Sequence, residues 1–242
     1  MIGTPRVHHR LTDSTNERAK QLAAAGAPHG TLVTAGAQTA GRGRQGRLWV
    51  APPGSAVLMS LITREPRPTL PLAGAVAVCE AMPVRCEIKW PNDVWVDGRK
   101  LAGILVEGRP QEGWAVLGLG LNVTSSEFPP ELREIATSLR LAGAEVRPEQ
   151  VLQRLLETLD AWLAGPDRAV LAAWSERDAL RGRPVSWEGG HGIAAGIDDT
   201  GSLLVDTPDG RLVLAAGEVH LNRPDRETRG ESPHRPPRAP RR

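Results

Sequence analysis

Lysine and asparagine are scarce in this chain of 242 residues, and both are unevenly placed. Only three of the 30 basic residues are lysines, yet Lys89 and Lys100 fall in one twelve-residue stretch that also holds Asn92. A lysine ammonium is a compact point charge and an arginine is a planar fork, so the two are not interchangeable at a chemical site. The pattern therefore predicts a site that needs ammonium groups here, with chance placement as the alternative.

The stretch KWPNDVWVDGRKLAGILVE, residues 89–107, predicts a β-hairpin that turns at Asp97-Gly98. In that register Asp93 pairs with Ala102, and Asp93 and Lys100 share one face as diagonal neighbours, about 7–8 Å apart at the backbone. Their side chains can then converge on one ligand. A cross-strand salt bridge on a solvated face, worth at most about 1 kcal/mol, is the alternative.

Glycine and arginine alternate in GRGRQGR, residues 41–47. The G-x-G-x-x-G spacing is not a dinucleotide-binding loop, because Pro52, Pro53 and Gly54 prevent the helix that should follow. The kinase motifs H-R-D and D-F-G are missing downstream, and a single copy is not an RNA-binding repeat. Glycine backbone and guanidinium groups suit a phosphate or carboxylate. Arg42 and Arg44 share a parity in an extended loop, so both are expected to face one ligand; a solvated basic turn is the alternative.

Two more stretches could border a ligand. In GLGLN, residues 118–122, glycine bares one face of a strand, which leaves room for something flat or narrow, or for close packing within the protein. In DSTN, residues 13–16, Ser14 and Glu17 fit a helix capping box. The free backbone donors and hydroxyls of a helix start can also hold a small polar ligand.

The elements around these stretches predict a mixed α/β domain followed by a small β-barrel module. Strands and helices mix over residues 1–182, and short strands separated by Gly or Asp turns fill 183–222. An Arg/Pro-rich tail over 223–242 is expected to be disordered. Helices are expected at Leu72–Met82, Glu131–Ala142, Pro148–Leu163 and Arg168–Leu180.

Charge and composition exclude several classes of protein. Seven of the 30 basic and three of the 28 acidic residues lie in the tail, so the body has a net charge of −2 rather than the +2 of the whole chain. Such a body does not suit a general nucleic-acid binder. Two cysteines give no disulfide framework, the N-terminus has no signal-peptide core, and no apolar run is long enough to span a bilayer. We expect a cytoplasmic protein without a membrane partner.

Together the motifs resemble the bacterial biotin protein ligases, the biotin–[acetyl-CoA-carboxylase] ligases. The segments that carry the resemblance, in the family's order, are STN at 14–16, Q-x-x-GRGRxGRxW from 38 to 49, KWPND at 89–93, RKLAGILVE at 99–107 and GLGLN at 118–122. The resemblance implies an α/β (α+β) catalytic domain with a mixed, roughly seven-stranded sheet and packed helices, plus a small all-β SH3-like C-terminal domain. Because the chain starts almost at the catalytic strand, it resembles the monofunctional type without a DNA-binding domain.

The resemblance also implies residue roles. Arg42, Arg44, Asp93 and Lys100 are implied to be catalytic, with Asp93 beside Mg²⁺ or the incoming lysine amine. The residues implied to contact biotin or the nucleotide are Ser14, Thr15, Asn16, Gln38, Arg42, Gly43, Arg44, Trp49, Lys89, Lys100, Gly103, Gly118 and Asn122.

The implied reaction uses biotin, ATP and Mg²⁺. Biotin is activated to biotinyl-5′-AMP and then transferred to a lysine of the biotin carboxyl carrier protein of acetyl-CoA carboxylase. No sequence-specific DNA partner is implied, and a homodimer is possible. The alternatives are a lipoate or octanoate protein ligase or transferase on the related fold and, from another class, a nucleic-acid-binding protein.

Overall fold

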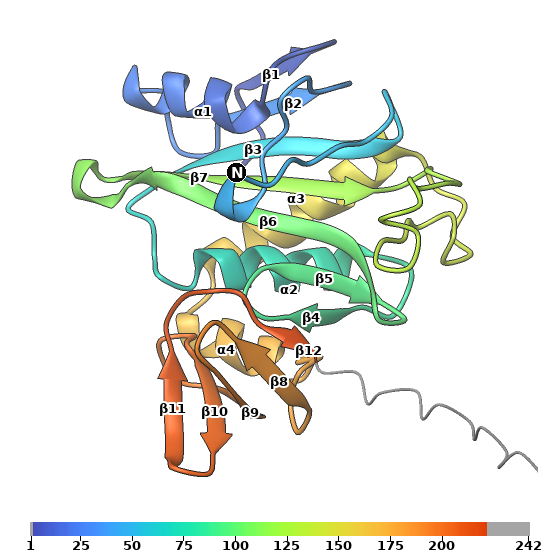
Figure 1. Cartoon of the computed structure of the whole chain (residues 1–242). Helices are drawn as coiled ribbons and strands as arrows, with labels where there is room; N and C mark the ends of the chain where they lie inside the picture. The colour runs from blue at the N-terminus through green and yellow to red at the C-terminus, as the bar shows by residue number, and fades with distance from the viewer. Residues whose placement is uncertain (1, 222–242) are drawn as a thin grey trace, which may run out of the picture.

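Two β-sheets organise the computed structural model, which describes residues 2–221 (Figure 1). The larger sheet has seven strands in the order β1-β2-β3-β7-β6-β5-β4. The β1–β2 pair is parallel and the other pairs are antiparallel. This mixed seven-stranded sheet confirms the predicted fold class. Its strands are β1 Arg6–His9, β2 Leu32–Ala35, β3 Ala56–Arg64, β4 Glu87–Lys89, β5 Asp93–Val96, β6 Arg99–Arg109 and β7 Trp114–Asn122.

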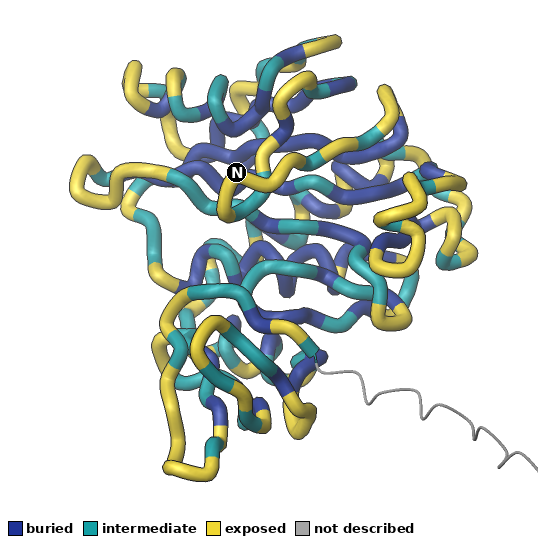
Figure 2. Tube along the Cα trace, in the orientation of Figure 1, coloured by how far each residue is buried: buried dark blue, intermediate teal, exposed yellow. Residues whose placement is uncertain are grey.

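The two faces of this sheet are covered differently. Side chains alternate along a strand, and one parity of β3 and β7 packs against α2 (Leu70–Ala81) and α3 (Pro148–Ala164). The other parity packs against α1 (Thr15–Ala24) at one end only. The buried sheet and its exposed connections are seen in Figure 2. The uncovered part of the α1 face is therefore free to form a cavity.

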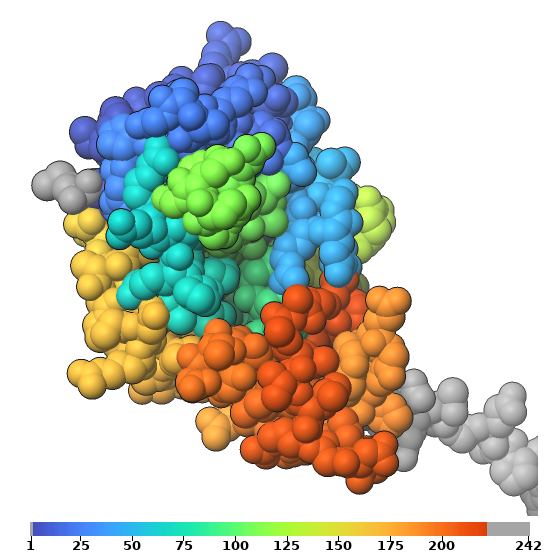
Figure 3. Space-filling model, turned by 90° about the vertical axis from the view of Figure 1, so that its left-hand side faces the viewer, coloured from blue at the N-terminus to red at the C-terminus, as the bar shows by residue number. Residues whose placement is uncertain are grey.

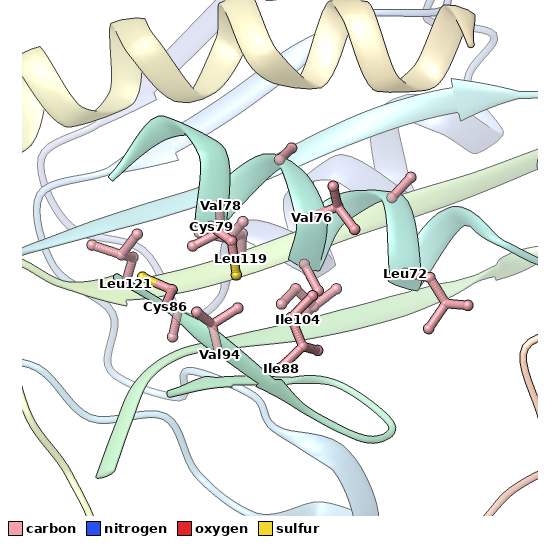
Figure 4. Packing of buried hydrophobic residues seen from close by; sticks show 14 of the residues in the cluster. Leu72, Val76, Val78, Cys79, Cys86, Ile88, Val94, Ile104, Leu119 and Leu121 are labelled. Atoms are coloured by element: carbon pink, nitrogen blue, oxygen red, sulfur yellow. The ribbon is translucent and has the colours of Figure 1, made fainter. Parts of the chain in front are cut away.

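Helix α2 is the centre of the core. Its sequence LPLAGAVAVCEA is apolar almost throughout, and ten of its twelve residues are buried. Figure 4 shows Leu72, Val76 and Val78 of this helix beside Ile104 of β6 and the leucines of β7. Burying one such side chain stabilises the fold by about 1.5–3 kcal/mol, so α2 fixes β6 and β7 as a rigid floor for whatever lies on the opposite face.

Two helix predictions need correction. The expected helix at 131–142 is wrong: the segment forms turns, and its backbone pairs with Lys100, which donates to Ile135 O and accepts from Thr137 N. The last helix, α4, is Asp167–Ser175 and stops five residues before the predicted end. Beyond it Arg177 and Ala179 pair with Ile88 of β4. In both places hydrogen bonds to a strand outweigh local helix propensity.

The second sheet is the predicted all-β module at the C-terminal end. It has the order β11-β10-β9-β8-β12, is antiparallel throughout, and lies below the large sheet in Figure 1. The indole of Trp90 donates to Gly201 O at 3.1 Å and holds the two parts together. Its strands are β8 Pro184–Trp187, β9 Gly190–Ile197, β10 Leu203–Thr207, β11 Gly210–Leu214 and β12 His220–Leu221.

Two short 3-10 turns complete the described part, η1 at Arg44–Gly46 and η2 at Pro110–Glu112. Over residues 2–221 no helix is long and apolar enough to cross a membrane. The predicted disordered tail, 223–242, lies outside the described residues.

Candidate active site

A cavity of about 720 Å³ opens on the α1 face of the large sheet. Every residue predicted for the site contributes to its lining, although these residues come from α1, the arginine-glycine loop (residues 41–47), β4 to β7 and the segment after β2. Gly217, Glu218 and His220, near the end of the described chain, close one side. Figure 3 shows the arginine-glycine loop, in light blue, reaching down to the orange-red C-terminal module. The cavity is thus walled by both parts of the molecule.

One end of the cavity is lined by neutral polar groups of Ser14, Thr15, Asn16 and Gln38, with Ser60 of β3 behind them, and we call these five residues the amide end. Gln38 Oε1 accepts from the backbone N–H of Thr15 at 2.7 Å and from its hydroxyl at 3.1 Å. Ser60 Oγ donates to Asn16 Oδ1 at 2.6 Å and lies 2.8 Å from Thr15 Oγ1. Thr15 and Asn16 are buried, so these contacts fix their side chains in place.

The predicted capping box is wrong. Ser14 is the N-cap residue, but its side chain makes no capping hydrogen bond. Glu17 turns away and pairs instead with Lys20 at 2.8 Å and with Arg42. Asp13, in place of Glu17, accepts the Ser14 backbone N–H at 2.7 Å. Because the Ser14 hydroxyl makes no capping bond, it stays available at the cavity wall.

Three glycines, Gly103, Gly118 and Gly120, form the floor of the cavity. Gly103 on β6 is opposite Gly120 on β7, and Gly118 lies beside Ser60 of β3. A Cβ atom at Gly118 would overlap the amide of Asn16, and one at Gly120 would overlap the indole of Trp49. The predicted room above GLGLN is real, and in this structure the Trp49 ring and the Asn16 amide fill it.

The opposite end carries cations, and we call it the cationic end (Arg44, Lys89 and Lys100). Lys100 Nζ lies 2.7 Å from Asp93 Oδ1, so the two side chains share one face as predicted and form the cross-strand ion pair that was the alternative to a ligand site. Lys100 Nζ also lies 5.7 Å from the centre of the Trp49 ring. Lys89 lies over Trp95 at 5.6 Å. Lys89 and Lys100, which are close in the sequence, therefore also lie close together in space, on either side of Asp93 and Trp95.

The predicted hairpin register holds only next to the turn. Asp97 and Gly98 have φ of 50° and 71°, as a two-residue turn requires, and Trp95 pairs with Lys100. A β-bulge between Val94 and Trp95 then shifts the pairing, so Asp93 lies opposite Gly103 rather than Ala102. The bulge increases local twist and pairs Asp93 with a residue that has no side chain.

The two arginines of the loop have different partners in this structure. Gly43, between them, is extended with φ of −119° and ψ of −178°, and the loop turns only beyond Arg44, where Gln45 and Gly46 have φ of 54° and 74°. Arg42 points to the amide end, where it pairs with Glu17 and lies 3.5 Å from Glu107. Arg44 points to the C-terminal module and donates to Gly217 O at 3.2 Å. Both side chains nevertheless line the cavity, and their contact with one ligand group stays a prediction.

Burial perturbs the cations of the cationic end. Lys89 is 9% exposed, and loss of hydration lowers the pKa of its ammonium, against the opposing effects of Asp93 and Glu218. Loss of hydration likewise lowers the pKa of Arg44, with Asp93 and Glu218 again opposing. Cations that have lost water in this way are stabilised by an anionic ligand, and the attraction is stronger than in bulk water.

Asn122 offers an acceptor that nothing in the described chain satisfies. Its amide nitrogen donates to Thr137 O at 3.0 Å, while its Oδ1 is buried without a hydrogen-bond partner. A buried unpaired acceptor costs about 1–3 kcal/mol. Because Asn122 lines the cavity, a ligand that brings an N–H donor to this point removes that cost.

Sequence reasoning missed several contributors, among them Gly120, Gly217 and Glu218 in the cavity lining and Ser60 and Glu107, which contact Asn16 from behind it. Gly120 and Glu107 lie inside the motifs GLGLN and RKLAGILVE, so the parity of those strands could have found them. Ser60, Gly217 and Glu218 are joined to the site only by pairings distant along the chain, such as the ion pair between Arg47 and Glu218, and no local signal marks them.

Comparisons with known proteins agree on one family. Residues 8–123 match the model of the biotin/lipoate A/B protein ligase family, and residues 182–222 match that of the biotin protein ligase C terminal domain. The chain is 36% identical over 234 residues to the biotin–[acetyl-CoA-carboxylase] ligase of Paracoccus denitrificans, covering 86% of this chain and 97% of that protein. For the Mycobacterium tuberculosis enzyme of the same name the identity is 38% over 236 residues, with 87% and 86% covered.

A solved structure has the same arrangement. The biotin protein ligase from Aquifex aeolicus in complex with biotin and ATP superposes with a TM-score of 0.81 at 28% identity, covering 91% of this chain and 100% of that chain.

Proposed function

The chain belongs to the biotin protein ligases of the biotin/lipoate A/B protein ligase family, which activate biotin with ATP and transfer it to an acceptor protein, and from this premise we propose how its cavity does so. Biotin lies with its ureido ring at the amide end and its carboxylate at the cationic end. ATP places its α-phosphate beside that carboxylate. The observation that carries the proposal is the polarity of the cavity, which is neutral at one end and cationic at the other.

At the amide end, the available groups complement a ureido group. A ureido ring has two N–H donors and one carbonyl acceptor. Asn16 presents an oxygen, the Ser14 hydroxyl can donate or accept, and Gln38, whose Oε1 is taken by Thr15, has only its amide nitrogen left to donate. A dithiolane or an alkyl chain, as in lipoate or octanoate, would leave these buried groups unpaired, which disfavours it strongly.

At the cationic end, the positive groups counter the repulsion between two anions. The biotin carboxylate attacks the α-phosphorus of ATP, the new C–O–P bond forms, and pyrophosphate leaves. Lys100 is proposed to contact the carboxylate and the α-phosphate, and Lys89 and Arg44 the phosphate oxygens on which charge develops. Such fixed donors each contribute several kcal/mol. Arg42, held at the amide end by acidic partners, is proposed to reach the biotin chain only when the loop closes.

The nucleotide base has a proposed place as well. The unpaired Oδ1 of Asn122 can accept from the 6-amino group of adenine, whereas guanine would direct a carbonyl oxygen at it. Trp49, over the glycine floor, is proposed to border the base. The same buried acceptor then favours ATP over GTP.

Mg²⁺ is proposed to arrive with the triphosphate. In the described chain no group of three or more His, Cys, Asp or Glu residues could hold a metal on its own, and the carboxylates in the cavity lining are Asp93 and Glu218. Mg²⁺ commonly binds through one carboxylate together with substrate phosphates, and Asp93 fits that role at the cationic end. There the ion would offset phosphate charge.

In the second step the amine of an acceptor lysine attacks the biotinyl carbonyl, AMP leaves, and an amide bond and one proton are produced. An ordinary lysine has a pKa near 10.4, so the amine must lose a proton, and we propose that Asp93 orients or accepts it. The acceptor is proposed to be the biotin carboxyl carrier protein of acetyl-CoA carboxylase, on the support of the Paracoccus and Mycobacterium relatives.

The experiment is pyrophosphate exchange into ATP with Mg²⁺ and with biotin, lipoate or octanoate in parallel. Exchange with biotin alone, followed by transfer to the carrier protein from isolated biotinyl-5′-AMP, is expected. Exchange that depends on lipoate or octanoate and ignores biotin would overturn the proposal.

A further inference from the structure

A carboxylate with no assigned role, that of Glu107, lies beneath the amide end. Glu107 is on β6 opposite Val116 of β7, and 21% of its side chain is exposed. Its Oε2 accepts from Asn16 Nδ2 at 2.9 Å. Its Oε1 lies 3.2 Å from Lys20 Nζ and 3.5 Å from a nitrogen of Arg42. One carboxylate thus touches the recognition residue, a helix lysine and the loop.

The contact with Asn16 determines which way its amide points. A carboxylate can only accept hydrogen bonds, so the NH₂ group of Asn16 must face Glu107. That nitrogen also lies 3.4 Å from Leu105 O, a second acceptor. The oxygen must then face Ser60 and the floor above Gly118, where there is no space for a Cβ atom. Asn16 consequently offers the cavity an acceptor and not a donor.

Glu107 belongs to a small cluster of ion pairs beside the amide end. Lys20 lies within ion-pair distance of both Glu107 and Glu17, and Arg42 pairs with Glu17. Two cations therefore balance two carboxylates beside the amide end. The charges cancel where the proposed ligand is neutral.

We propose that Glu107 is a positioning residue for biotin recognition, which acts by fixing the Asn16 amide with its oxygen towards the ureido N–H groups. The inference rests on the proposed function. It assigns Glu107 an effect on biotin affinity that reaches the ligand through Asn16, and no effect on ATP binding or on the chemical step.

The test is a double-mutant cycle read by equilibrium biotin binding and by the KM values in pyrophosphate exchange. Glu107→Gln keeps the shape of the side chain but can donate to Asn16 as well as accept, so it no longer selects one amide orientation. Biotin affinity is expected to fall about tenfold, with the KM for ATP unchanged. In an Asn16→Ala background the same Glu107 change should have less than about a twofold effect, because neighbouring residues that act together are not additive.

Two controls separate this role from a structural one. Glu149→Gln removes an exposed carboxylate that pairs with Arg6 at 2.8 Å on another part of the surface, and biotin affinity should not change. Glu107→Asp keeps an acceptor-only group and should restore part of the affinity that Glu107→Gln loses. Thermal unfolding of each variant shows whether the fold persists.

The inference is overturned if Glu107→Gln folds and binds biotin normally, if its effect is equally large in the Asn16→Ala background, or if KM for ATP rises with that for biotin. Failure of the proposed function would show differently, as wild-type protein without biotin-dependent exchange.

Discussion

Replacing Lys100 by arginine keeps the charge and changes the shape at the cationic end. The ammonium lies 2.7 Å from Asp93, and a Cβ built on Gly103 would lie only 3.2 Å from Nζ, so the ammonium rests against the floor. A guanidinium is wider and needs a fork-shaped partner. It can keep the ion pair with Asp93, but it cannot occupy the same point beside the floor glycine and the Trp49 ring.

The expected magnitudes differ for stability and for rate. The Lys100 side chain is 33% exposed, and arginine retains the ion pair, so the free energy of unfolding should change by less than about 1 kcal/mol. One misplaced charge-stabilising donor costs about 10²-fold in rate, or about 2.7 kcal/mol of barrier. Lys100→Arg should therefore lower the rate of pyrophosphate exchange about a hundredfold while leaving the melting temperature almost unchanged.

The assay measures exchange and thermal unfolding on one preparation. Arg109→Lys is the matched control, because Arg109 forms an exposed pair with Glu112 at 2.8 Å and the change swaps the same two residue types in the other direction. It should affect neither measurement. Near-normal exchange by a stable Lys100→Arg protein would refute the catalytic role of Lys100 and leave a structural ion pair.

Four further predictions test other parts of the cavity. Gly118→Ala places a methyl group against the Asn16 amide, so biotin affinity should fall at least tenfold with a stability loss of about 1–3 kcal/mol, as titration and thermal unfolding can show. Asn122→Ala should reduce the preference for ATP over GTP in exchange about tenfold. Burial lowers the pKa of Lys89 from its ordinary 10.5, so Lys89 should lose its charge below pH 10.5. The KM for ATP should therefore begin to rise at a lower pH than it would if this lysine were exposed. The folded state binds fewer protons than the unfolded state in that window, so the free energy of unfolding should rise with pH there, and Lys89→Arg should lack both effects. Hydrogen exchange of Gly41–Arg47 should slow when biotinyl-5′-AMP binds, and unchanged exchange would contradict loop closure.

The parts of the site that the sequence could predict are those with a local signal. Asp97-Gly98 demands a tight turn, and that turn brings Asp93 and Lys100 to one face, although the β-bulge beyond Trp95 could not be predicted. The alternation in GLGLN bares one side of β7. The nearly apolar stretch at 70–81 has to be buried. Each of these follows from backbone geometry within about ten residues, which sequence patterns describe well.

The predictions that were wrong depend on partners far along the chain. Ser14 and Glu17 have the spacing of a capping box, yet Glu17 turns to Arg42, 25 residues away, because an ion pair is available there. The segment 131–142 favours a helix, yet its backbone instead forms two hydrogen bonds with the backbone of Lys100, through Ile135 O and Thr137 N. Arg42 and Arg44 likewise have different partners, Glu107 and Gly217, that are distant along the chain. No local pattern contains these partners.

The glycine floor shows why a motif can indicate a ligand without revealing what lies in its place. Bare glycines on β6 and β7 predict room for something flat, and in this structure the Trp49 indole lies over Gly120. This position is unfavourable for the indole, because its Nε1 is buried without a hydrogen-bond partner among residues 2–221, a loss of about 1–3 kcal/mol. A flat ligand in this space must therefore displace the ring or stack on it. If the ring moves to where its N–H meets water or ligand, it recovers that loss, so displacing it costs less than the area it buries would indicate.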